Sequence, residues 1–322
     1  MMKSSGGRFI FSIKKLILMI EYPPLPTGEK PTWDGECFQL GKRSTRILAY
    51  SSNLAGWDDD LTALHEVEAG DGQHPIDVAS RNMAIDALRR YNFPTDGAVL
   101  EIGCSSGFLL HDLRQEFPRA QIVGADIVVK PLERLGGSLP RVPLLQMDLL
   151  QCPLRERQFD AVVALNVLEH IENDEAALMK MARLLKPGGI LVLEVPQGPD
   201  LYDYFDAYLR HFRRYSKKEL HVKIASSGLR LLKIGFLGFI PYMPFWAMKK
   251  LNRLRFGVRG EKSPKIEVMV RDQIKVTAKS KILDFVFLVE KALVKKIAFP
   301  FGIRCTVVAR KNAGNDVKVG DA

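Results

Sequence analysis

The 322-residue chain has only four cysteines and no long uninterrupted hydrophobic run. The cysteines show no paired spacing, which argues against a zinc site or a disulfide framework and fits a reducing cytoplasm. The apolar stretch at residues 9–20 is too short to span a bilayer and is interrupted by Lys14 and Lys15. No small-residue cleavage site follows it, so we do not expect a signal peptide.

Acidic residues are scarce in one part of the chain. Residues 229–311 hold 19 Lys/Arg and 5 Asp/Glu, a net charge of +14, whereas the whole chain carries only +10. This asymmetry suggests an anionic partner such as a membrane surface, a phosphorylated substrate or nucleic acid. A solvated basic face is the alternative interpretation.

A short apolar run, Ala98–Ile102, is broken only by Glu101 and is typical of a buried parallel strand. The run stops at Gly103. Another glycine, Gly107, precedes residues 108–113, which have helical spacing. We therefore predict a strand, a tight turn and a helix, which together form the first βα unit of a doubly wound fold.

Two kinds of nucleotide ligand compete for such a turn. A dinucleotide turn requires G-x-G-x-x-G, but Ser105 stands two residues after Gly103. The carboxylate of Glu101 would repel a pyrophosphate and suits a ligand with a cationic amino group. The pattern Glu101-x-Gly103-x-x-x-Gly107 resembles motif I of class I S-adenosylmethionine (SAM)-dependent methyltransferases, with Ser105 replacing the usual middle glycine. A βα turn without a ligand is the alternative.

Two further strands are predicted. The strand at residues 121–126 ends in Asp126, and the strand at residues 142–147 is followed by Asp148. Asp126 can accept hydrogen bonds from both ribose hydroxyls of NAD or SAM, or it can cap the next helix. The resemblance implies that Asp148 accepts from the adenine amino group. We expect Glu101, Asp126 and Asp148 to lie along one edge of the sheet.

The fourth strand (residues 159–165), a helix (173–185), the sequence Leu-Lys-Pro-Gly-Gly and the fifth strand (190–195) strengthen this resemblance, which covers roughly residues 76–236. It implies an α/β fold: a Rossmann-like, seven-stranded, mostly parallel sheet with an antiparallel last strand and a helical C-terminal insertion. It implies SAM as the cofactor, with an apolar neighbour of Asp148 flanking the adenine. The cofactor contacts it suggests are Glu101, Gly103, Cys104, Ser105, Gly107, Asp126, Ile127, Met147, Asp148, Leu149 and Asn166.

The domain boundaries follow from these elements. We expect an N-terminal segment that is partly disordered (1–44), a methyltransferase core with N-terminal lid helices (45–236), an apolar and basic helical insertion (237–302), a last core strand (303–311) and a disordered tail (312–322). Residues 238–300 resemble an interfacial membrane helix pair. A helical subdomain packed on the sheet is the alternative.

Methyl transfer from a sulfonium is an in-line displacement, so positioning at ~3–3.5 Å can supply most of the acceleration. A general base helps only where the acceptor must lose a proton. His170, just past the fourth strand, is the first candidate, and His211 is the second.

Four residues are candidates for contact with the acceptor. Trp57 precedes the first strand, and Arg213, Arg214 and Tyr215 follow the fifth strand. The two arginines could clamp a carboxylate or phosphate. Packing and surface ion pairs are the alternative roles.

Residues 166–170 also resemble ubiquinone-pathway O-methyltransferases, in which an acidic-x-x-Glu-His segment is linked to a divalent metal. Glu169 and His170 match this segment, but Asn166 replaces the first acid, so we predict no metal. The N/D-P-P-Y/F motif of base-specific DNA and RNA N-methyltransferases is missing after the fourth strand. Nucleic acid is therefore disfavoured as the acceptor.

The sequence thus predicts a SAM-dependent methyltransferase that acts on an oxygen of a small or lipid-linked acceptor. We expect it in the cytoplasm, with residues 238–300 offering a peripheral contact to the inner membrane face. The alternatives are a catalytically inactive SAM-binding or partner-binding module and an NAD(P)-dependent oxidoreductase, which the glycine spacing disfavours. The sequence leaves the oligomeric state open.

Overall fold

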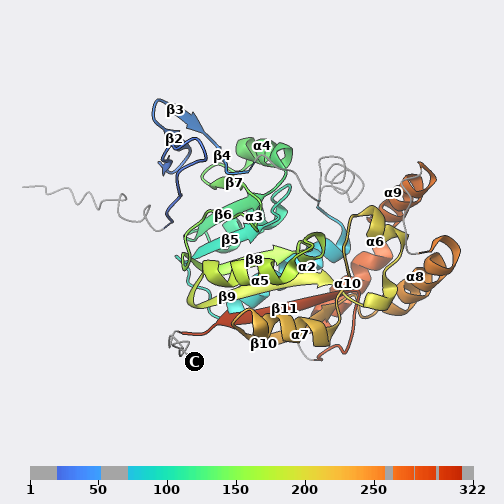
Figure 1. Cartoon of the computed structure of the whole chain (residues 1–322). Helices are drawn as coiled ribbons and strands as arrows, with labels where there is room; N and C mark the ends of the chain where they lie inside the picture. Colours follow the sequence, from blue (N-terminus) through green and yellow to red (C-terminus); the bar gives the residue numbers. More distant parts are fainter. Residues whose placement is uncertain (1–19, 52–71, 258–263, 279, 295–296, 314–322) are drawn as a thin grey trace, which may run out of the picture.

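The computed structural model describes residues 20–51, 72–257, 264–278, 280–294 and 297–313. Its centre is an eight-stranded sheet with the order β10-β11-β9-β8-β5-β6-β7-β4 (Figure 1). The strands are β4 (Ile47–Ala49), β5 (Ala98–Ile102), β6 (Gln121–Asp126), β7 (Leu144–Gln146), β8 (Phe159–Leu165), β9 (Leu185–Pro196), β10 (Leu229–Leu237) and β11 (Arg304–Lys311).

The strands from β4 to β9 pair in parallel, and β11 lies antiparallel between β9 and β10. The predicted Rossmann-like, mostly parallel sheet with an antiparallel last strand is confirmed. The predicted number of seven strands is one too low, because Ile47 pairs with Leu144 and adds β4 as a parallel edge strand.

Helices cover both faces of this sheet, and each face has its own apolar core. Leu100 and Val162 pack into one core, whereas their neighbours Val99 and Val163 pack into the other. All four side chains are fully buried. Burial on both faces explains why the strands have continuous apolar runs instead of alternation.

The helices of the core flank these strands along the chain. They are α2 (Pro75–Arg90), α3 (Phe108–Glu116), α4 (Val129–Ser138), α5 (Asp174–Leu184), α6 (Tyr204–Tyr208) and α7 (Lys217–Ser226), with short 3₁₀ turns η2 (Leu168–His170) and η3 (Pro199–Leu201). Ser216 caps α7, because its side chain accepts a hydrogen bond from the Glu219 N–H at 3.1 Å.

A small antiparallel sheet precedes the core. It consists of β1 (Thr32–Trp33), β2 (Phe38–Leu40) and β3 (Arg43–Thr45), in that order. Phe38 is fully buried, and its ring lies 4.9 Å from that of Tyr22. Residues 20–44 therefore pack onto the core, whereas residues 1–19 lie outside the described residues, so partial disorder of residues 1–44 stays a prediction.

Three helices form the insertion between β10 and β11: α8 (Tyr242–Phe256), α9 (Pro264–Ala278) and α10 (Lys281–Leu293). Figure 1 shows them beyond the carboxyl ends of β8 and β9, on the side away from the small N-terminal sheet. Helix α10 contacts α2, and α8 and α9 contact α6. No helix in the described part of the chain is long and apolar enough to cross a bilayer.

Candidate functional site

A cavity of about 1390 Å³ opens at the carboxyl ends of the parallel strands. Its walls come from the turn after β5, the ends of β6 to β9, helix α2 and the insertion. This volume exceeds the ~300–1,000 Å³ of a typical small-molecule pocket. The cavity can therefore hold a nucleoside-sized cofactor and an acceptor together. Open α/β sheets bind ligands at this edge, where the strand order reverses around β5.

The turn after β5 approaches the cavity with its backbone. Gly103 has a φ of 72°, and a side chain there would collide with Val167. Ser105, at the position of the usual middle glycine, adopts a left-handed φ of 43°. Its N–H donates to Oδ2 of Asp126 at 2.8 Å. Gly103, Cys104 and Ser105 all line the cavity, as expected for cofactor contacts.

Gly107 has a different role from the one predicted. It has a φ of 72° and precedes the first residue of α3, and it is not among the residues that line the cavity. A side chain at this position would collide with Leu135. The glycine is required for close packing of α3 against α4, and we correct its assignment as a cofactor contact.

The three predicted acids all line the cavity, from β5, the end of β6 and the turn after β7. Glu101 is 6% exposed, and its Oε2 is buried without a hydrogen-bond partner among the described residues. Burial, and then the nearby charge of Asp126, raise the pKa of Glu101 well above its ordinary value. A cationic group in the cavity would compensate this carboxylate.

Asp126 is anchored by the backbone around it. Its two carboxylate oxygens accept from the N–H groups of Ser105 at 2.8 Å and Val128 at 2.9 Å. Burial raises its pKa, and these hydrogen bonds oppose that effect. Each oxygen keeps a second lone pair, so the carboxylate can still accept from a diol. Both the ribose role and the capping role are compatible with this geometry.

The predicted adenine side of the cavity is formed by residues around β7 and β8. Asp148 accepts from the Leu150 N–H at 2.9 Å through Oδ1. Asn166 has a φ of 53°, and its side-chain amide donates to Glu194 at 3.2 Å. The remaining predicted contacts on this side also line the cavity: Ile127, Met147 and Leu149.

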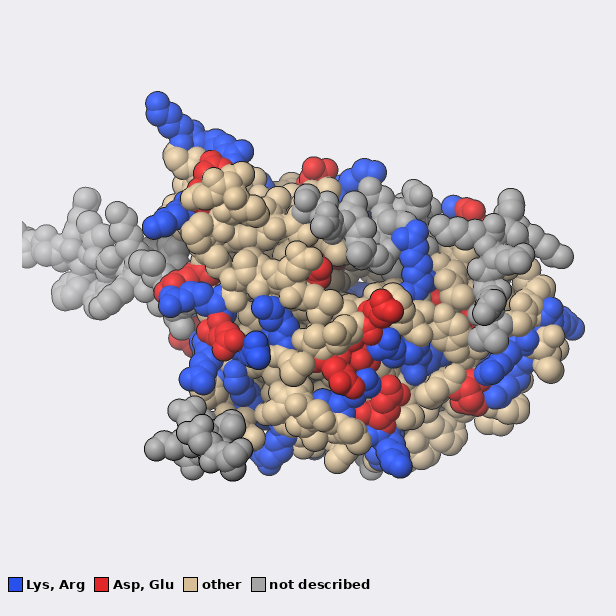
Figure 2. All heavy atoms as spheres, viewed as in Figure 1, with Lys and Arg blue, Asp and Glu red and all other residues tan. Residues whose placement is uncertain are grey.

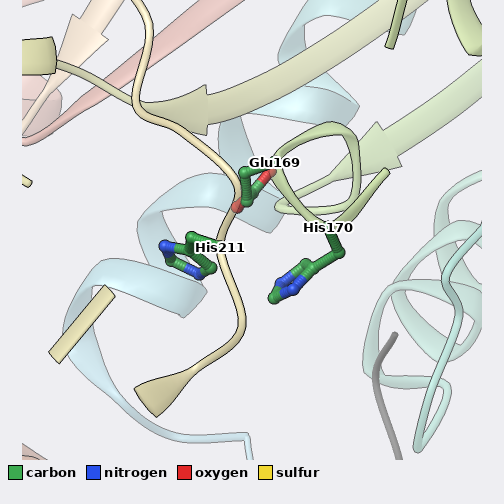
Figure 3. Close-up of side chains that lie close together, drawn as sticks. All are labelled: Glu169, His170 and His211. Atoms are coloured by element: carbon green, nitrogen blue, oxygen red, sulfur yellow. The ribbon is translucent and has the colours of Figure 1, made fainter. Parts of the chain in front are cut away.

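Three titratable side chains that line the cavity lie close together. Glu169 and His170 come from η2, and His211 comes from the segment after α6 (Figure 3). One potential ligand atom from each lies within 4.8 Å of the other two. Burial raises the pKa of Glu169 to about 8, and burial lowers the pKa of His211 against the opposing effect of Asp206. The proximity of His211 to the other two could not be foreseen from their sequence separation.

A buried polar cluster supports His211. Its Nδ1 lies 3.0 Å from Oδ1 of Asp206, which also accepts from Arg214 at 2.8 Å. Lys249 of α8 completes the cluster, with Nζ 2.6 Å from Asp203 and 2.7 Å from Asp206. Burial would raise the pKa of Asp206, but Arg214 and Lys249 hold it well below its ordinary value.

Sequence reasoning missed Asp206 and Lys249. Lys249 stands in a basic stretch that resembles a solvated surface, yet it is only 3% exposed. Its pairing with Asp206 joins residues 43 positions apart, so no local pattern indicates it.

The four predicted acceptor contacts differ in position. Trp57 lies outside the described residues. Arg214 lines the cavity, although its guanidinium is held by Asp206 and by main-chain carbonyls.

Arg213 and Tyr215 do not line the cavity, and we correct their assignment. Tyr215 is fully buried and donates to Asp174 at 2.9 Å, while Arg213 pairs with the same carboxylate at 2.8 Å. The two side chains therefore belong to a structural ion-pair cluster between α5 and α7.

The insertion supplies an apolar part of the cavity wall. The side chains of this apolar wall come from all three insertion helices and are Phe245, Met248, Ile274, Leu283 and Phe287. The insertion also contributes the polar side chains of Lys249, Gln273 and Thr277, whereas the carboxylates of Glu101, Asp126 and Asp148 come from the sheet.

Comparisons with known proteins agree with this architecture. A methyltransferase domain family matches residues 100–193. A ubiquinone/menaquinone biosynthesis C-methyltransferase of Syntrophotalea carbinolica is 29% identical over 138 residues, which cover 41% of this chain and 58% of the relative. A malonyl-[acyl-carrier protein] O-methyltransferase of Halalkalibacterium halodurans is 28% identical over 132 residues, covering 38% and 48%. The chain thus spans about half the length of these relatives.

Two solved structures show the same fold at low identity. Phosphoethanolamine N-methyltransferase 2 of Haemonchus contortus, in complex with S-adenosyl-L-methionine, gives a TM-score of 0.50 at 17% identity over 78% of this chain and 56% of that one. The [4+2]-cyclase SpnF gives 0.52 at 18% identity over 79% and 94%. The second neighbour shows that this fold alone does not define a reaction. Residues 100–193 thus match a methyltransferase domain family, and the fold is the Rossmann-like fold of such proteins, in agreement with the predicted resemblance to class I SAM-dependent methyltransferases.

Proposed function

We propose that this chain transfers a methyl group from SAM to an oxygen of a small or lipid-linked acceptor that carries an apolar group. One observation supports the proposal most strongly. Carboxylates at the ends of three neighbouring strands, Glu101, Asp126 and Asp148, open into the same cavity as the apolar wall of the insertion. The first feature suits a cationic nucleoside, and the second suits an apolar acceptor.

The cofactor would lie across the carboxyl ends of β5, β6 and β7. In this arrangement Glu101 faces the amino group, Asp126 accepts from the ribose hydroxyls and Asp148 accepts from the adenine amino group. Met147 and Leu149 are buried at 4% and 5% exposure and offer apolar contacts to the adenine ring. The unpartnered Oε2 of Glu101 supports this orientation, because a buried carboxylate is costly without a partner.

The chain would accelerate the reaction mainly by positioning. The sulfonium is already an activated leaving group, so an acceptor held in line at ~3–3.5 Å needs no protein nucleophile. Side chains of the insertion line the cavity beside the proposed cofactor site and would help to hold the acceptor in place. His170 and His211 remain the predicted catalytic residues, because both line the cavity near the end of β8.

The apolar side chains of the insertion support an acceptor with a hydrocarbon or ring portion. Phe245 and Met248 of α8 and Phe287 of α10 all line the cavity. Apolar pockets select for such groups at ~25 cal/mol per Å² of buried apolar area. Strongly polar acceptors would gain nothing from this wall.

Two measurements test the proposal. SAM binding is measured by calorimetry, and the protein is then incubated with methyl-labelled SAM and either lipid extracts or cytosolic extracts. We expect label in an apolar product, and mass spectrometry with NMR identifies the methylated atom. Failure to bind SAM contradicts the proposal, and binding without transfer to any extract favours an inactive SAM-binding module.

We also propose a peripheral membrane contact through α10. Ile282, Phe285 and Leu288 recur every three residues along this helix and are 76%, 65% and 66% exposed. Exposed Lys281 and Lys291 border them and suit an anionic lipid surface. Figure 2 shows Lys and Arg mixed with Asp and Glu on the visible face, without a continuous basic patch. The proposed membrane contact is therefore supported mainly by the exposed apolar side chains of α10.

The four cysteines are free thiols, and three of them are buried. Unpaired cysteines fit the reducing cytoplasm that we propose as the location of the protein.

A further inference from the structure

Glu169, His170 and His211 form a group with the composition of a metal site. Two imidazoles and a carboxylate approach one another within 4.8 Å, measured between one potential ligand atom of each. The ring centroids of His170 and His211 are 4.7 Å apart. The sequence argued against a metal because Asn166 replaces an acid, but the tertiary structure brings His211 to this position from a separate segment.

The carboxylate of Glu169 is the strongest indication of a ligand. The residue is 1% exposed and lines the cavity, and both of its oxygens lack a hydrogen-bond partner among the described residues. A buried polar group without a partner costs ~1–3 kcal/mol, and more when it is charged. Figure 3 shows this side chain beside the two imidazoles. A bound cation would satisfy it.

Asp206 provides the outer support that such sites need. Histidines that bind metals usually donate their second ring N–H to a carboxylate, which fixes the tautomer and orients the ring. His211 has this arrangement, because its Nδ1 lies 3.0 Å from Oδ1 of Asp206. The other nitrogen, Nε2, is then the one available for a metal. The neighbouring cations Arg214 and Lys249 both pair with Asp206, so their charges are compensated.

From these contacts we infer that Glu169, His170 and His211 bind a divalent transition-metal ion. Two nitrogen ligands and one oxygen ligand favour Zn²⁺, Fe²⁺, Co²⁺ or Mn²⁺ over Mg²⁺ or Ca²⁺, which prefer oxygen ligands. Metal–ligand distances of ~2.1 Å place tetrahedral ligand atoms about 3.4 Å apart. Ligand atoms that lie up to 4.8 Å apart would have to approach by about 1.4 Å, which rotation of the side chains can supply.

The ion would leave coordination positions open toward the cavity. An acceptor oxygen bound there would have a lower pKa, and the ion would orient it. This role rests on the proposed function, whereas the binding of the metal does not.

Metal binding is tested directly on the full chain. Protein treated with a chelator is titrated with Co²⁺, followed by its visible absorption, and with Zn²⁺, followed by calorimetry. We expect one equivalent per chain. The Glu169→Gln and His211→Asn variants should each bind at least ~10-fold more weakly, and Asp206→Asn should lose ~10–100-fold.

His221→Asn is the matched control, because His221 is exposed on α7 and outside the cavity. It should leave the affinity for the metal unchanged. Circular dichroism of each variant checks that it is folded. A wild-type chain that takes up neither ion overturns the inference, whatever the variants do, and so do folded variants with unchanged affinity.

Calorimetry with SAM on the same samples separates the two proposals. Metal uptake without SAM binding would support the metal site and contradict the proposed function. SAM binding without metal uptake would overturn only the metal site.

Discussion

The parallel sheet and the insertion are stabilised by different interactions. The strands β5 and β8 are buried among apolar side chains on both faces, with Val99, Leu100 and Val162 fully inaccessible. The insertion leaves large apolar side chains exposed, including Leu254 at 84% and Ile282 at 76%. It is attached to the core through a few buried apolar side chains, such as Val270 and Ile274 beside Tyr204, and through buried polar contacts.

Two of these contacts carry charge. Lys249 of α8 reaches Asp203 and Asp206, and the carboxylate of Glu290 on α10 accepts from the N–H groups of Gly238 at 2.6 Å and Ile240 at 3.1 Å. Buried ion pairs tolerate few geometries, because a displaced partner leaves an uncompensated charge. The sheet thus provides stability, whereas the polar contacts position the insertion over the cavity.

The largest expected effect is the loss of stability when the buried ion pairs of Lys249, which attach the insertion, are removed. Lys249→Met leaves Asp203 and Asp206 without their buried cation, which should lower the free energy of unfolding by ~3–5 kcal/mol. Chemical denaturation followed by circular dichroism measures the loss. Lys250→Met is the matched control, because Lys250 is 36% exposed in its pair with Asp200 and such pairs contribute ~0–1 kcal/mol. Equal losses in the two variants would contradict the comparison.

The next largest effect is expected on the affinity for SAM, when Asp126 at the end of β6 is replaced. Asp126→Ala removes the proposed acceptor of two hydrogen bonds from the ribose, each worth ~1.5–3 kcal/mol for a charged group. The dissociation constant for SAM should rise by ~100-fold or more. Calorimetry measures it, with Asp86→Ala on the exposed face of α2 as the control. An unchanged affinity in a folded Asp126→Ala variant refutes the ribose assignment.

A smaller effect is expected on membrane binding, when an exposed apolar side chain of α10 is replaced. Phe285→Ser removes an exposed apolar side chain from α10, and burial of such a side chain in a lipid interface is worth ~1.5–3 kcal/mol. Partition into vesicles containing anionic phosphatidylglycerol should fall by ~10-fold. Val222→Ser on α7 is the control, since Val222 is 55% exposed on the core. If the wild-type chain does not bind these vesicles, the membrane contact is wrong.

The smallest effect concerns pH. Burial and Asp126 raise the pKa of Glu101, so this carboxyl keeps its proton to higher pH than a free glutamic acid. Only the ionised form attracts the amino group of SAM, and the affinity should therefore rise several-fold as pH increases through this raised pKa. Glu101→Gln should remove that rise, whereas Glu133→Gln on α4 should not. Identical pH profiles for wild type and Glu101→Gln would exclude this role, because ionisation of SAM itself is common to both.

Much of the core could be predicted from the sequence. The strands β5, β6 and β8 lie where their apolar runs indicated, because a strand buried on both faces has a strong local signature. Asp126 and Asp148 reach one cavity because the carboxyl ends of parallel strands meet at one sheet edge. The presence of the insertion could also be predicted, from the length of chain between β10 and β11.

Other features depended on contacts between distant segments. Arg213 and Tyr215 occur in a polar, aromatic stretch typical of a binding loop, but packing between α5 and α7 directs them to Asp174. Ile47 lies in a strand of only three residues, β4, which joins the sheet through its parallel pairing with the distant β7.

The sequence by itself determined the glycine-bounded turn after β5 and the acids at the ends of successive strands. These features follow from local backbone preferences and from the geometry of parallel sheets. Only the tertiary structure decided the surroundings of His211, Glu169 and Lys249. Their relation depends on how the insertion and the segment after α6 pack over the sheet. Such packing is the sum of many weak, distant contacts that no short pattern of residues encodes.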